Sequence, residues 1–237
     1  MRASITIEIP IPKNASPITH RMMRSTSRSV AIGGIADDSL TGTVPPYFTR
    51  HDIDRLSDSP DVSMTPFFVL ALGAYRGELR RAVHQMKFRN ARWIAARFGR
   101  NLAHATAAHS GAWQPDVVTW APTTSKRVRL RGVDQSAIIA ANLARVLRVR
   151  RMRLLRRLDD NTQTGASRET RRRGPRYVVR SNAVRDRRIL LVDDVMTTGT
   201  TLARARDALL AEGALEVRCA VIARVTRMNS GVSARVG

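Results

Sequence analysis

The sequence has one cysteine, Cys219, which excludes an intramolecular disulfide framework and any zinc site built from clustered cysteines. A lone thiol within the apolar run VRCAVIA predicts a small, buried hydrophobic side chain and fits a reducing environment. Long apolar runs are also missing, because the longest, Phe67 to Ala74, is far shorter than the ~20 residues that span a bilayer. The N-terminus lacks the compact apolar core of a secretory signal. We therefore expect a cytoplasmic protein with no membrane partner.

Acidic residues are few, since 19 Asp and Glu stand against 41 Lys and Arg in 237 residues and leave a net charge of +22. Such an excess predicts attraction to polyanions, which are phosphate-rich substrates, nucleic acid or an anionic membrane surface. Aromatic residues make up only 5% of the chain, and no basic face interleaved with aromatics is visible. The arginines could therefore equally serve only to keep the surface solvated.

Apolar periodicity is weak in the first 63 residues, which are rich in Ser, Thr, Pro and Gly. Ile5 to Pro12 alternates like a strand, but its prolines restrict it to a sheet edge or an isolated piece. A low density of apolar side chains does not offset the entropy lost on ordering. We expect residues 1–63 to form a largely disordered extension, with a nucleic-acid-binding arm or a targeting segment as the alternative.

Regular patterns begin near Thr65, so we expect one domain over residues 64–228 and a short polar tail over 229–237. Helical spacing predicts two helices, or one helix broken near Phe88, from these apolar residues: Leu79, Val83 and Met86, then Ile94, Phe98 and Leu102. From Asp116 to Val225 strands and helices alternate, which predicts an α/β fold with a parallel sheet. The expected strands are Asp116–Pro122, Leu154–Leu155, Ile189–Val192 and Leu215–Val225.

The most specific motif is ILLVDDVMTTGTTL, from Ile189 to Leu202. Four apolar residues predict a strand buried on both faces, and Asp193 and Asp194 fall at its C-terminal end, where open α/β sheets place their ligands. A loop rich in hydroxyls follows and leads into a helix that starts near Leu202, which suits a phosphate. Carboxylates beside a phosphate cradle indicate a sugar phosphate as the ligand.

This motif resembles the phosphoribosyl-pyrophosphate signature of type I phosphoribosyltransferases. The resemblance implies a parallel sheet flanked by helices, with Asp193 and Asp194 as catalytic residues that orient the ribose hydroxyls directly or through Mg²⁺. It implies that one loop binds the 5′-phosphate, formed by Thr197, Thr198, Gly199, Thr200 and Thr201. Carboxylates near the ring would also stabilise the positive charge that develops as pyrophosphate departs.

The segment after the first strand of this fold resembles the family's pyrophosphate-binding loop, whose candidates here are Ala121, Pro122, Thr123, Lys126 and Arg127. Hydroxyl and backbone N–H groups of Thr123 can donate to the ligand, and the two cations can neutralise the leaving group. The order Pro122, Arg127, Arg131, Gly132, Gln135 resembles the ComF/GntX-like branch of the family. Asp134 replaces an Asn of that pattern and is well placed to cap the next helix.

Two further segments share the resemblance. The arginine-rich stretch Asn161 to Arg180 resembles the mobile loop that closes over the sugar, with Gln163, Ser167 and Arg171 in matching places, although a disordered linker is the alternative. Upstream, Ala74 to Ala95 resembles the region before the ComF-type core. Lys87 within it could reach an anionic ligand or could be a solvated lysine at a helix end. The paired cysteines of the zinc ribbon usual in ComF-type proteins are missing here, so zinc is not expected.

Other nucleotide sites fit less well, because a P-loop needs a lysine after Gly199 and a dinucleotide fold needs a Gly-x-Gly-x-x-Gly run. A hydrolase with two opposed carboxylates is also disfavoured, since neighbouring strand residues point to opposite faces and cannot hold one spot without a turn. The expected function is binding of phosphoribosyl pyrophosphate and Mg²⁺, with transfer of the phosphoribosyl group to an unassigned acceptor. A non-catalytic, competence-related or nucleic-acid-associated protein on the same fold is the alternative, and a homodimer stays open.

Overall fold

The computed structural model describes residues 48–64, 66–89, 91–158, 175–180 and 182–225. The residues predicted to form most of the extension (1–47), the mobile-loop candidates Gln163, Ser167 and Arg171, and the tail over 229–237 lie outside this part. No helix in the described ranges is long and apolar enough to cross a membrane.

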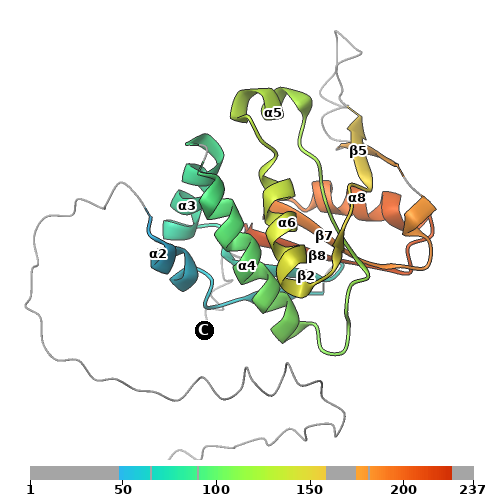
Figure 1. Cartoon of the computed structure of the whole chain (residues 1–237), viewed down its shortest axis with the longest axis horizontal. Helices are drawn as coiled ribbons and strands as arrows, with labels where there is room; N and C mark the ends of the chain where they lie inside the picture. Colours follow the sequence, from blue (N-terminus) through green and yellow to red (C-terminus); the bar gives the residue numbers. More distant parts are fainter. Residues whose placement is uncertain (1–47, 65, 90, 159–174, 181, 226–237) are drawn as a thin grey trace, which may run out of the picture. The chain divides into compact units, whose positions relative to one another are not determined.

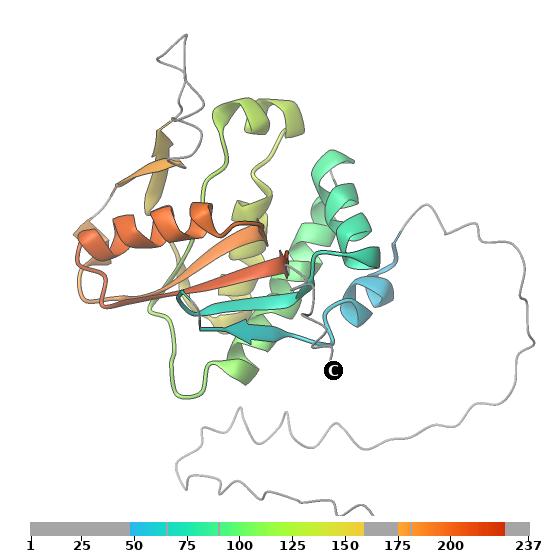
Figure 2. The same ribbon diagram turned by 180° about the vertical axis from the view of Figure 1, so that it is seen from behind.

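One six-stranded sheet organises the fold, in the order β1-β2-β8-β7-β3-β4 (Figures 1 and 2). Its strands are β1 (Asp61–Ser63), β2 (Val69–Ala74), β3 (Val117–Trp120), β4 (Arg150–Arg151), β7 (Arg188–Met196) and β8 (Glu216–Arg224). Only the pairing of β1 with β2 is antiparallel among these. The predicted parallel sheet flanked by helices is confirmed, because the central strands are apolar runs that bury both faces.

Helices cover the two faces unequally. On one face lie α3 (Gly77–Phe88), α4 (Arg92–His109) and α6 (Gln135–Leu147), with the larger core beneath them; α8 (Thr200–Ala211) covers the other face (Figures 1 and 2). The predicted break between α3 and α4 is present. Gly99 lets α4 approach α6 closely, since a Cβ there would lie 2.5 Å from the Ile139 carbonyl oxygen.

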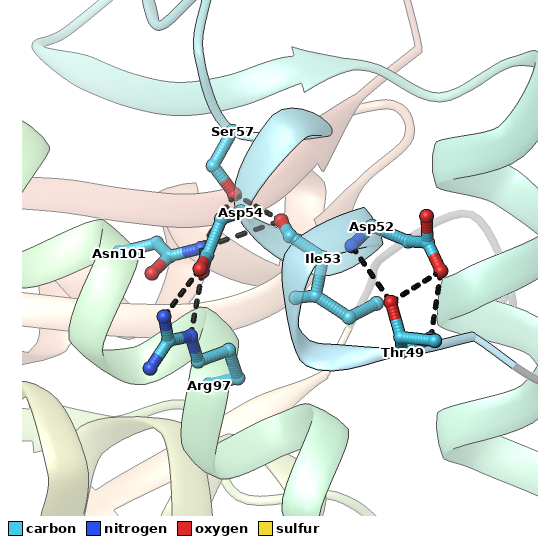
Figure 3. Close-up of polar contacts among 7 residues, drawn as sticks. All are labelled: Thr49, Asp52, Ile53, Asp54, Ser57, Arg97 and Asn101. Atoms are coloured by element: carbon cyan, nitrogen blue, oxygen red, sulfur yellow. Dashed lines mark hydrogen bonds and ion pairs between the residues drawn. The ribbon is translucent and has the colours of Figure 1, made fainter. Parts of the chain in front are cut away.

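The expected domain boundary after residue 63 is too late, because α2 (Arg50–Arg55) and β1 precede it. A capping box between Thr49 and Asp52 begins α2, and Ile53 is fully buried in the larger core (Figure 3). Asp54 of α2 makes a bidentate pair with Arg97 of α4. These polar contacts to a distant helix order a segment whose low apolar density suggested disorder.

Two expectations about the middle of the chain are wrong. The strand of the main sheet that follows β3 in the chain is β4, whereas Leu155 begins β5 (Leu155–Leu158), which pairs antiparallel with β6 (Arg176–Val179) in a separate sheet. β6 itself falls within the stretch expected to be a loop. Its side chains alternate between exposed and half-buried, a pattern that the surrounding arginines obscure in the sequence. Nearer the N-terminus, β2 is a strand that the predicted elements do not include.

Candidate phosphoribosyl site

The site forms where β7 extends beyond its neighbour β3. The register pairs Trp120, the last residue of β3, with Val192, while β7 continues to Met196 beside β8. β7 is therefore longer than predicted, and Asp193 and Asp194 belong to the strand instead of following it. Since β3 has already ended, the edge of β7 is open at the two carboxylates.

Asp193 is held from two directions. Its Oδ1 accepts a hydrogen bond from Ser136 Oγ at 2.9 Å and another from the backbone N–H of Asp194 at 2.8 Å. Burial raises the pKa of Asp193, and the neighbouring Asp194 carboxylate raises it further, while these hydrogen bonds and Lys87 oppose the shift. The side chain is thus oriented by α6, and its ionised form is disfavoured by burial and by Asp194.

Asp194 has a different partner, because its Oδ2 lies 2.9 Å from Lys87 Nζ at the end of α3. The two side chains are only 17% (Lys87) and 16% (Asp194) exposed. Lys87, left open in the sequence between an anion ligand and a solvated lysine, is therefore a partner of the acidic pair.

One cavity of about 410 Å³ contains both carboxylates. The expectation that adjacent strand residues need a turn to share a spot is wrong here, because the cavity lies along the open edge of β7. Of the predicted site residues, these line it: Ala121, Pro122, Thr123, Arg127, Asp193, Asp194, Thr197 and Thr201. Four others do not: Lys126, Thr198, Gly199 and Thr200.

The predicted pyrophosphate loop is partly helical. After Thr123, α5 (Ser125–Arg131) begins with Thr124 as its N-cap, whose side chain accepts from the backbone N–H of Arg127. The backbone N–H of Thr123 donates to Asp134 Oδ2 at 3.3 Å, so it is engaged within the protein. Asp134 is the N-cap residue of α6, as expected, but its side chain makes no capping hydrogen bond and accepts from Thr123 instead. Burial raises the pKa of the Asp134 carboxyl. The hydroxyl of Thr123 and the guanidinium of Arg127 are what this segment offers a ligand.

The threonine-rich loop ends in a helix start, as predicted, although α8 begins at Thr200, two residues before Leu202. Gly199 is the N-cap with φ of 78°, a left-handed conformation that favours glycine. It supplies no side-chain oxygen to cap the first turn, which suits an anion bound by backbone N–H groups. The Thr198 and Thr200 hydroxyl oxygens lie 3.0 Å apart and brace the turn.

Further residues line the cavity beyond the predicted site. Arg131 and Gln135 appeared only in the ComF-type pattern, and Tyr75 only in the segment that resembles the region before the ComF-type core, whereas no motif marked Ser136 or Arg157. Ser136 is 57 positions from Asp193 in sequence, so its hydrogen bond depends on the packing of α6 against β7. Nothing in the sequence around Arg157 distinguishes it from the other arginines.

Two carboxylates are too few to enclose a metal by themselves, and the described residues contain no group of three or more His, Cys, Asp or Glu that could do so. Mg²⁺ is commonly bound through one or two carboxylates together with substrate oxygens and water. Asp193 and Asp194 therefore fit a Mg²⁺ ion that arrives with an anionic substrate.

Comparison with known proteins gives matches over this region. Residues 129–232 match the family "Phosphoribosyl transferase domain". The chain is similar to "DNA utilization protein YhgH" of Escherichia coli O6:H1, with 31% identity over 157 residues that cover 63% of this chain and 69% of that protein. It is also similar to "Competence protein F" of Haemophilus influenzae, with 27% identity over 187 residues covering 75% and 80%.

Among solved structures, it is similar to the glutamine phosphoribosylpyrophosphate amidotransferase from B. subtilis complexed with ADP and GMP. That match has 25% sequence identity and a TM-score of 0.39, and covers 54% of this chain and 26% of the other.

Proposed function

The chain belongs to the ComF-like branch of the type I phosphoribosyltransferases, and we propose that its cavity binds phosphoribosyl pyrophosphate with Mg²⁺ and transfers the phosphoribosyl group to an acceptor. One observation carries this proposal: Asp193 and Asp194 share a single cavity with the start of α8 and with the segment after β3. The carboxylates suit the ribose hydroxyls, Thr197 and Thr201 suit the 5′-phosphate, and Arg127 suits the diphosphate.

Each part of the site has a chemical role in this reaction. Ser136 orients Asp193, and Lys87 orients Asp194, so that both carboxylates face the sugar. Negative charge held beneath the ring stabilises the positive charge that develops on the sugar as the diphosphate leaves. Arg127 and Arg131 neutralise the departing diphosphate. Bound Mg²⁺ would supply further charge neutralisation for the diphosphate oxygens.

Thermal unfolding tests the binding proposal. At a ligand concentration ~100-fold above the dissociation constant, phosphoribosyl pyrophosphate with Mg²⁺ should add about 2.7 kcal/mol to the free energy of unfolding, or roughly 5–10 °C in Tm. Asp193→Asn combined with Asp194→Asn should abolish the shift and leave the fold intact. An unchanged Tm in the wild-type protein would refute the proposal.

A second candidate function, association with nucleic acid, is favoured by a basic surface along the edge of the sheet. Between Arg145 and Leu158 there is no acidic residue, and six arginines are exposed: Arg145, Arg148, Arg150, Arg151, Arg153 and Arg156. They extend from the end of α6 across the edge strand β4 to β5. A row of exposed cations without acids fits a phosphate backbone.

Binding to a labelled oligonucleotide at increasing salt tests this second function. Affinity should fall steeply with salt, and replacing Arg148, Arg150 and Arg153 by Ala should reduce the slope of log K against log salt by about 3 at most. Arg151 is left in place because its guanidinium stacks on Trp120 at 5.5 Å. Alanine at the exposed Arg80, Arg100 and Arg204 serves as the control of equal charge. If both triple variants lose the same affinity and slope, the effect comes from net charge alone, and the basic surface along the sheet edge is not a specific site.

A further inference from the structure

Lys87 lines the cavity, although it lies far in sequence from the motif Ile189 to Leu202 that supplies both carboxylates. It lies in the last turn of α3, upstream of the residues 129–232 that match the family. Its Nζ is 2.9 Å from Asp194 Oδ2, and about five sixths of each side chain is buried. An ion pair this enclosed fixes both side chains, in contrast to the many exposed pairs that contribute little.

Of the two carboxylates, Asp194 is the one that can exchange its partner. Asp193 is fixed by Ser136 and by a backbone N–H of its own strand. Asp194 is held by Lys87, whose ammonium is a point charge on a flexible four-carbon chain. A ribose hydroxyl that donates to Asp194 therefore competes with Lys87 for the same oxygen.

The neighbouring residues direct a released Lys87 toward the diphosphate side. Phe88, the next residue, packs under the Arg131 guanidinium at 5.2 Å from the ring centroid. This contact joins the end of α3 to the end of α5, whose Arg127 and Arg131 line the same cavity. Lys87 thus lies beside the cations expected to receive the leaving group.

The charges in the cavity are nearly balanced. Its lining has four cations and three carboxylates, namely Lys87, Arg127, Arg131 and Arg157 with Asp134, Asp193 and Asp194. While Lys87 neutralises Asp194, its charge is not available to a diphosphate. A group that occupies Asp194 therefore frees one positive charge in the cavity.

We propose that Lys87 is an exchangeable counter-ion, which pairs with Asp194 in the free protein and moves to the diphosphate when the ribose hydroxyls take Asp194. This inference rests on the proposed function and adds a residue that couples sugar recognition to neutralisation of the leaving group. Lys87 would therefore raise the affinity for the sugar that bears a diphosphate more than the affinity for the same sugar without one.

Calorimetric titration with two ligands tests this coupling. Ribose 5-phosphate and phosphoribosyl pyrophosphate, each with Mg²⁺, are titrated into the full-length wild-type protein and into Lys87→Met. The affinity ratio between the two ligands should shrink about tenfold or more in Lys87→Met, because the charge that contacts the diphosphate is lost. Lys87→Arg should keep most of the ratio. Arg81→Met removes one charge from an exposed site on the same helix and should leave the ratio unchanged.

The outcomes separate this inference from the function on which it rests. If the wild-type protein binds neither ligand, the proposed function fails. If both ligands bind and Lys87→Met weakens them equally or leaves the ratio unchanged, the exchange is refuted. Should Lys87→Met fail to fold because Asp194 is left unpaired, Lys87→Met with Asp194→Asn removes both charges, and the ratio should still be reduced relative to Asp194→Asn alone.

Discussion

At the scale of single residues, the site depends on two adjacent acids with different partners. Asp193 is oriented by a hydroxyl and a backbone N–H, whereas Asp194 is oriented by an ammonium. The difference follows from the strand, since neighbouring side chains leave it in opposite directions. Burial and the neighbouring Asp194 carboxylate raise the pKa of Asp193, so holding two ionised carboxylates this close together costs the folded protein free energy.

This cost predicts that Asp193→Asn stabilises the folded protein. Because the pKa of Asp193 is raised on folding, its contribution to stability is lost as pH rises from the ordinary Asp value through the raised one. The asparagine oxygen can still accept from Ser136 and from the Asp194 N–H. The variant should exceed the wild type by about 1–2 kcal/mol at pH 8 and by little near pH 4.

Chemical denaturation of the two proteins across this pH range measures the difference. Asp58→Asn, at an exposed carboxyl, is the control and should follow the wild type. A difference between Asp193→Asn and wild type that does not grow with pH would contradict the origin assigned to it.

At the scale of elements, the site depends on helices whose ends are tied to one another. α2 is held to α4 by Asn101, whose Nδ2 donates to the Ile53 carbonyl oxygen, Asp54 Oδ1 and Ser57 Oγ in the cluster that Figure 3 shows. α4 in turn packs on α6, which carries Ser136 to Asp193. The chain before residue 64 is therefore linked through two helices to the site.

Removal of the Asn101 hydrogen bonds should destabilise the packing of α2 on α4 more than the rest of the domain. Asn101→Ala deletes three hydrogen bonds and should cost about 1–3 kcal/mol, because the acceptors on α2 are left partly buried. Hydrogen exchange should show faster exchange in α2 than in α6. Arg55→Ala, which removes an exposed pair with Asp52, is the matched control and should change stability by at most ~0.5 kcal/mol. Uniformly faster exchange throughout the domain would contradict a local tie.

The close approach of α4 and α6 predicts a larger effect at Gly99. A Cβ there would lie 2.5 Å from the Ile139 carbonyl oxygen and 2.9 Å from Asn142 Cβ, so Gly99→Ala forces the helices apart. We expect a loss of about 1–3 kcal/mol by thermal or denaturant unfolding, despite the better helix propensity of alanine. A stabilised variant would show that the two helices separate without cost.

At the scale of the whole molecule, the sequence was sufficient for three adjacent strands of the sheet, β3, β7 and β8, but not for β1, β2 and β4. The strand of the DD motif and the strand over Glu216–Arg224 were predictable, because apolar runs of strand length between helical patterns have few other solutions. The motif also brings together residues that line one cavity, namely Asp193, Asp194, Thr197 and Thr201. α5 and β6 were not predictable, since runs of arginine hide the weak alternation or helical pattern beneath them.

The partners of the two site carboxylates could not be predicted, because they come from segments distant in the sequence. The pairs Lys87 with Asp194 and Ser136 with Asp193 join helices to a strand far along the chain. The packing of α3 and α6 against the sheet brings these residues together. The capping box that begins α2 is present in the sequence as Thr49 and Asp52, and the ordered domain includes this helix.

The central claim is that Asp193 and Asp194 bind the ribose of phosphoribosyl pyrophosphate. The most direct measurement is the Tm of the wild-type protein and of the double Asn variant, each with and without this ligand and Mg²⁺. The account predicts a rise of roughly 5–10 °C at saturating ligand for the wild type and none for the variant. A rise of equal size in both proteins, or no rise in the wild type, would contradict it.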